Sequence, residues 1–96
     1  MAYNHPLDEK LKNDRWKIKI RDRERTEDPH VTVLRNEKAW RVSLRDLRLL
    51  DGGNRKELAP VLAIIKRDLD KLIQQWDLMY PENPVSSQEK VDDENS

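Results

Sequence analysis

The apolar side chains of this chain change their spacing once, from every second residue to every third or fourth, at a pair of adjacent glycines. Before the glycines, residues 15–21 and 30–44 alternate apolar and polar side chains, as a strand with one buried face does. After them, apolar residues recur at steps of three and four from Leu58 to Trp76, which indicates an amphipathic helix. The order of the two patterns predicts an α+β domain in which strands precede a helix.

The second and third predicted strands are separated by Asn36 and Glu37, so we expect an antiparallel hairpin with its turn there. A four-residue loop would serve equally well and would leave the facing of the side chains unchanged. Directly opposed residues share a face of a sheet. The predicted pairs are Leu34 with Ala39, Val33 with Trp40, Thr32 with Arg41, Val31 with Val42 and His30 with Ser43.

The predicted fold is a three-stranded antiparallel sheet packed on one face by a long C-terminal helix, a β-β-β-α arrangement of two layers. The helix ends near Tyr80 and begins after Asn54, which is compatible with a capping residue. Pro60 means that the helix either begins nearer Glu57, with the proline in its first turn, or opens with a bend. We expect the three tryptophans, Trp16, Trp40 and Trp76, to be large members of the core.

A chain of 96 residues suits one domain, and both of its ends are poor in core-forming side chains. We expect residues 1–13 to be a flexible N-terminal segment and residues 14–80 to form the single α+β domain. Residues 81–96 hold five acids and only two apolar side chains, too few to offset the entropy of ordering, so a disordered acidic tail is predicted.

The charge is unevenly distributed, although the net charge is zero. Residues 1–56 carry fifteen Lys and Arg against ten acids, and residues 57–96 carry four against nine. The front of the chain is therefore basic, which favours RNA or an acidic protein as a partner. The absence of cysteine, of a signal sequence and of a long apolar run leads us to expect a cytoplasmic protein without a membrane span.

No motif for a cofactor or a metal is found. The two glycines are adjacent and do not form a phosphate-binding loop, and the two histidines, His5 and His30, lack the spacing of metal ligands. We therefore predict no cofactor and no metal site.

Three short motifs resemble a known family. They are "EDPHVTVL" (27–34), "RKEL" (55–58) at the start of the helix and "QQWD" (74–77) near its end. Together they look like domain-of-unknown-function family 4160, small prokaryotic proteins described as toxin-antitoxin candidates, over about residues 15–80. The resemblance implies a protein held by an antitoxin-like partner. The chain departs from the family pattern at Thr32, where a second histidine is usual, and at Asp28, where a proline is usual, so only His30 carries over.

The face of the sheet opposite the helix is the candidate functional surface. We expect Lys17, Lys19, His30, Thr32 and Arg41 to lie there in water. The predicted binding residues are Lys17, Lys19, Thr32, Arg35 and Arg41.

The function predicted from this face is that of a small domain that docks an acidic protein partner. The alternative is a metal-independent ribonuclease toxin with His30 as general acid or base and with Arg41, together with Lys17 or Lys19, as phosphate clamps. A third interpretation is an ordinary solvated sheet face whose lysines discourage aggregation.

Overall fold

The computed structural model describes residues 2–22 and 27–86, and these form an α+β domain with two layers. A five-stranded antiparallel sheet has the strand order β1-β2-β3-β4-β5. The strands are β1 (Tyr3–His5), β2 (Trp16–Ile20), β3 (His30–Arg35), β4 (Lys38–Ser43) and β5 (Leu49–Asp51). The helices are α1 (Glu9–Asn13), the short 3₁₀ helix η1 (Arg55–Leu58), α2 (Ala59–Arg67) and α3 (Leu69–Met79).

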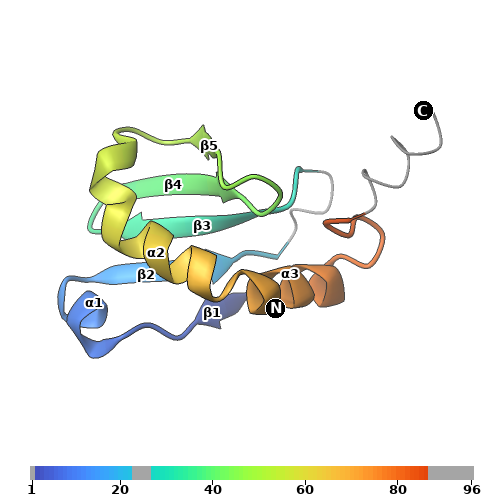
Figure 1. The fold of residues 1–96 in the computed structure, drawn as a ribbon, viewed down its shortest axis with the longest axis horizontal. Helices are drawn as coiled ribbons and strands as arrows, with labels where there is room; N and C mark the ends of the chain where they lie inside the picture. Colours follow the sequence, from blue (N-terminus) through green and yellow to red (C-terminus); the bar gives the residue numbers. More distant parts are fainter. Residues whose placement is uncertain (1, 23–26, 87–96) are drawn as a thin grey trace.

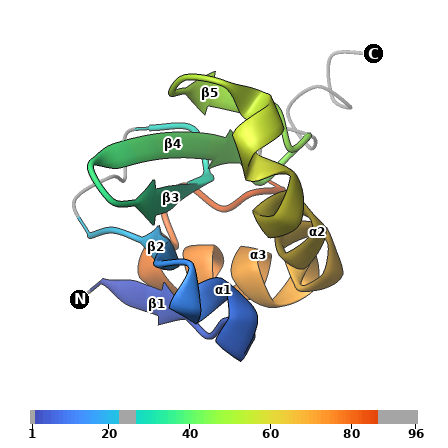
Figure 2. The same ribbon diagram turned by 90° about the vertical axis from the view of Figure 1, so that its left-hand side faces the viewer.

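The helices α2 and α3 lie on one side of the curved sheet, and Figure 2 shows no described helix over the other side of β3 and β4. The core between the layers contains all three tryptophans, which are at most 3% exposed. From the sheet, β2 contributes Ile18 and Ile20, and from the helices Val61 and Ile65 are fully buried against them. Figure 1 shows α2 and α3 following one another along the length of the sheet.

The hairpin has the predicted register. All five predicted pairs between β3 and β4 are present, from His30 opposite Ser43 to Leu34 opposite Ala39. Asn36 adopts φ 55°, the left-handed conformation that a two-residue hairpin turn requires and that asparagine tolerates. Burial of the Val33 and Trp40 face fixes this register, because a shift by one residue would turn that face outward.

The predicted three-stranded sheet with one long helix is wrong. The sheet has two further strands, β1 and β5, and each contains only three residues, too few for a period of two to be visible in the sequence. Residues 1–13, expected to be flexible, supply β1 and α1, and Leu11 of α1 is buried in the core. Val85, within the segment expected to be a disordered tail, is also buried, whereas residues 87–96 lie outside the described part of the chain.

The expected long helix is divided at Asp68, between α2 and α3. Its start agrees with one of the two alternatives: Asn54 caps η1 through a hydrogen bond from Lys56 N (2.9 Å), and Pro60 lies in the first turn of α2. The division is invisible in the sequence because the apolar spacing continues across it, with Ile65 and Leu72 buried on either side. Asp68 forms side-chain contacts with His5 of β1 and with the adjacent Arg67, described below.

Candidate functional site

Two rows of side chains cross the side of the sheet that carries no described helix. In the first row Thr32 of β3 lies between Lys19 of β2 and Arg41 of β4. In the second row Leu34 of β3 lies between Lys17 of β2 and Ala39 of β4. We call these six residues the open face: Lys17, Lys19, Thr32, Leu34, Ala39 and Arg41.

The two lysines of the open face have no acidic partner within the described chain. Lys17 is exposed and Lys19 is partly exposed, and neither forms an ion pair or a side-chain hydrogen bond with a described residue. Arg41 differs, because its Nη1 lies 2.8 Å from Glu27 Oε1. Among the described residues, the open face therefore presents two positive charges without an acidic partner, next to the partly apolar row that contains Leu34 and Ala39.

Thr32 and Arg35, both predicted to bind, are not fully available on the open face. Thr32 is 2% exposed, and its hydroxyl has no hydrogen-bond partner among the described residues. Arg35 pairs across the strands with Trp16, so it lies at the end of β3 on the opposite side of the pleat. Its guanidinium stacks 4.9 Å from the centre of the Trp16 ring, and its Nε donates to Asp14 O (3.1 Å).

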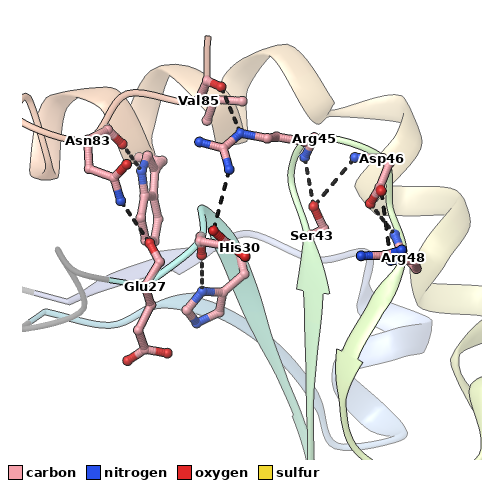
Figure 3. Close-up of polar contacts among 10 residues, drawn as sticks. Glu27, His30, Ser43, Arg45, Asp46, Arg48, Asn83 and Val85 are labelled. Carbon is pink, nitrogen blue, oxygen red and sulfur yellow. Dashed lines mark hydrogen bonds and ion pairs between the residues drawn. The ribbon is translucent and has the colours of Figure 1, made fainter. Parts of the chain in front are cut away.

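His30 is buried rather than in water, which corrects the expectation that placed its imidazole on the open face. It is 1% exposed, and its ring centre lies 5.6 Å from that of Trp76 in α3. Its Nδ1 lies 2.7 Å from the carbonyl oxygen of Asp28, an acceptor, so Nδ1 carries the proton that is donated there (Figure 3). Packing and hydrogen bonding account for this histidine as a structural residue of the β3 end.

The segment after α3 closes over this end of the sheet, and sequence reasoning missed it. Asn83 accepts from Trp76 Nε1 (2.8 Å) through its backbone carbonyl, and its side chain donates to Glu27 O (2.7 Å). Arg45 Nε donates to Val85 O (3.0 Å), as Figure 3 shows. No periodic pattern marks these residues, because each acts through one specific hydrogen bond and not through a repeated face.

A second polar cluster joins β1 to the junction between α2 and α3. His5 is 6% exposed, and its Nε2 lies 2.9 Å from Asp68 Oδ2, while the Tyr3 hydroxyl lies 2.8 Å from its Nδ1. A carboxylate only accepts, so His5 Nε2 donates to it, and in the neutral imidazole Nδ1 accepts from Tyr3. Arg67 Nη2 also donates to Asp68 Oδ2 (3.0 Å). Sequence reasoning discounted His5 because the segment around it was expected to be flexible.

The electrostatics of this cluster favour a charged Asp68. The hydrogen bonds from Arg67 and His5 hold the pKa of the Asp68 carboxyl well below its ordinary value. Burial, together with the nearby Asp68 carboxylate, raises the pKa of Tyr3. The cluster is thus a latch that anchors the edge strand β1 at the junction between α2 and α3.

We expect this latch to make stability depend on pH at the acid end. Because folding lowers the Asp68 pKa, its contribution is complete above the unfolded value of about 3.9 and is lost as pH falls below that value. Urea unfolding should therefore show wild-type stability falling more steeply than that of Asp68→Asn between about pH 5 and pH 2. The exposed neighbour variant Asp70→Asn should follow the wild type, and parallel curves for wild type and Asp68→Asn would contradict the latch.

Among the described residues, no three His, Cys, Asp or Glu side chains converge in a way that could hold a metal ion. No helix in the described ranges is both long and apolar enough to cross a membrane.

A family model described as Domain of unknown function (DUF4160) matches residues 16–77, from the start of β2 to the last turns of α3. Searches of curated proteins and of solved structures gave no match. The matched range contains the whole open face and His30.

Proposed function

The chain belongs to the family described as Domain of unknown function (DUF4160), a description that states no activity, and we propose a function from the geometry of the domain's surface. The domain binds an acidic protein partner through the open face. The observation that carries this proposal is the pair Lys17 and Lys19, which have no acidic partner in the described part of the chain and lie next to a row that contains Leu34 and Ala39.

A surface of this kind has the features of a protein-binding patch. Its small apolar area offers burial, while its charges attract an acidic surface and determine the orientation in which it docks. Arg41 adds a third cation. A carboxylate of the partner could bind its guanidinium together with Glu27 or in place of Glu27. Trp16 and Trp40 lie in the core, so the open face has no aromatic side chain for stacking bases, and this favours protein over single-stranded RNA.

The ribonuclease alternative has weaker geometric support. It requires an accessible imidazole near a phosphate clamp. His30 is 1% exposed and donates from Nδ1 to a backbone carbonyl, and Arg41 is bound to Glu27. We therefore do not propose catalysis for these residues.

The toxin-antitoxin association stays a prediction of the family resemblance. It agrees with the proposed docking, because an acidic antitoxin-like protein is one kind of partner that would fit a basic open face. The cytoplasm as its compartment is likewise an expectation from the sequence.

The proposal predicts that reversing the two lysine charges weakens docking. We expect Lys17→Glu combined with Lys19→Glu to weaken binding of a glutamate-rich peptide by at least roughly tenfold at low salt, because attraction becomes repulsion. Fluorescence anisotropy of the labelled peptide measures this effect, and raising the salt concentration should reduce the difference.

The control carries the same change of charge on the helical layer. Lys66 and Lys71 are exposed on α2 and α3 and have no ion pair among the described residues. The double variant Lys66→Glu and Lys71→Glu should lose much less affinity than the open-face variant. Equal losses would mean that only net charge matters, and the proposed face would then be wrong.

A further inference from the structure

A groove lies at one end of the open face, where α1 meets the start of β2 and the end of β3. Its volume is about 480 Å³. It is lined by Lys12, Arg15, Lys17, Leu34, Arg35 and Asn36. Four of these six residues are cations and none is an acid, so the groove concentrates positive charge more strongly than the rest of the open face does.

One of the four cations is held in place before any ligand binds. Stacking of Arg35 on Trp16 and its hydrogen bond from Nε to Asp14 O restrain the guanidinium from two directions. A restrained guanidinium loses less entropy on binding an anion than a mobile side chain does. The remaining donors of its planar fork can still serve a bidentate acceptor.

The backbone around the groove is unusual. Arg15 has φ 68° and Asn36 has φ 55°, and these are two of the three non-glycine residues with positive φ in the described chain. The left-handed conformation is uncommon for arginine in particular, and such conformations often occur at functional sites. At Arg15 it forms the corner between α1 and β2, so that Lys12 and Arg15 line the same groove as the cations of the sheet.

We propose that this groove binds a phosphate group with at least two negative charges. An adjoining hollow is lined by Asp14 together with Arg15 and Arg35, so one acid offsets part of the charge and leaves three of the four positive charges in excess. A single carboxylate would neutralise only one of them, whereas a phosphomonoester or pyrophosphate group carries about two or more charges and offers several acceptor oxygens. Leu34 provides an apolar surface for the group that bears the phosphate.

This inference goes beyond the proposed docking function, because it concerns a different ligand. Of the two open-face lysines on which the docking proposal rests, only Lys17 also lines the groove. Arg15 belongs to the groove alone, and Lys19 belongs to the open face alone. The two proposals can therefore fail separately.

Inorganic pyrophosphate is the probe, and isothermal titration calorimetry on the full chain gives its Kd. Arg15→Gln should raise the Kd by roughly tenfold, because a charge-assisted contact is lost, and Lys12→Gln should raise it in the same direction. Lys19→Gln removes the same charge outside the groove and should change the Kd less than about twofold. Arg15 and Lys12 are exposed, so circular dichroism should show both variants folded.

Absence of pyrophosphate binding to the wild type, or equal weakening in Arg15→Gln and Lys19→Gln, would overturn the groove as a phosphate site. ADP and a short single-stranded RNA serve as further arms that identify the source of the phosphate. If ADP or the RNA competes with pyrophosphate for the wild type, and this competition is lost in Arg15→Gln, the result supports the proposal. Binding of the glutamate-rich peptide that depends on Lys19 but not on Arg15 tests the docking function independently.

Discussion

Replacement of Trp76 with alanine is expected to lower the free energy of unfolding by about 3–5 kcal/mol, the usual cost of removing a large buried aromatic side chain. Trp76 is fully buried, and the centre of its ring lies 5.6 Å from that of His30 and 4.2 Å from that of Tyr80. The substitution also removes the donor to Asn83 O, and with it one anchor of residues 80–86. Urea unfolding followed by circular dichroism measures the change.

Leu78 provides the control on the same helix. Its side chain is 76% exposed, so Leu78→Ala should change the free energy of unfolding by less than about 0.5 kcal/mol. Comparable losses in the two variants would contradict the burial of Trp76 against the ring of His30. The interpretation of that histidine as a structural residue would then have to be abandoned.

Gly52→Ala is expected to destabilise the domain by about 2–4 kcal/mol, the combined scale of a strained backbone and an overpacked core. Gly52 adopts φ 120°, a conformation that side-chain-bearing residues rarely adopt. A Cβ at this position would lie 2.5 Å from Cδ1 of Trp40, and that indole is 1% exposed, so it has little room to move. Thermal and urea unfolding should both show the loss.

Gly53 provides the control, because it shows whether any alanine substitution in this loop lowers stability. A Cβ on Gly53 would meet no atom within 4 Å, so Gly53→Ala should leave stability within about 0.5 kcal/mol of the wild type. If Gly52→Ala behaved like Gly53→Ala, the close approach of β5 and its following turn to Trp40 would be wrong.

The hairpin could be predicted from the sequence because two independent signals agree there. The alternation around Val31, Val33 and Trp40 identifies the buried face, and Asn36 marks a turn at the position that this facing needs. The lysines of β2 could be placed on the opposite side for the same reason. This part of the candidate site therefore depends on local pattern alone.

The environment of His30 could not be predicted in this way. Alternation assigns a side chain to a face of the sheet but does not indicate which distant segment covers the end of a strand. Here Trp76 and the turn around Asn83 cover it through tertiary contacts that leave no periodic signal. The groove was missed for a similar reason, since Lys12 and Arg15 reach it only because α1 packs beside β2.

The division of the helix at Asp68 was also hidden. At the division the Asp68 side chain contacts His5 and Arg67, and a single non-helical residue does not disturb the spacing of the apolar positions. The edge strands β1 and β5 were missed because three residues are too few for their alternation to stand out. In each case the structure depends on tertiary contacts that the local spacing of apolar residues does not show.

Chemical-shift mapping with the glutamate-rich peptide tests the central claim most directly, because it shows which surface of the isotope-labelled domain is contacted. The predicted result is that amide signals of β2, β3 and β4 shift around Lys17, Lys19 and Arg41, while those of α2 and α3 stay in place. Shifts concentrated around Lys66 and Lys71 on the helical layer, with β2 unchanged, would contradict docking on the open face.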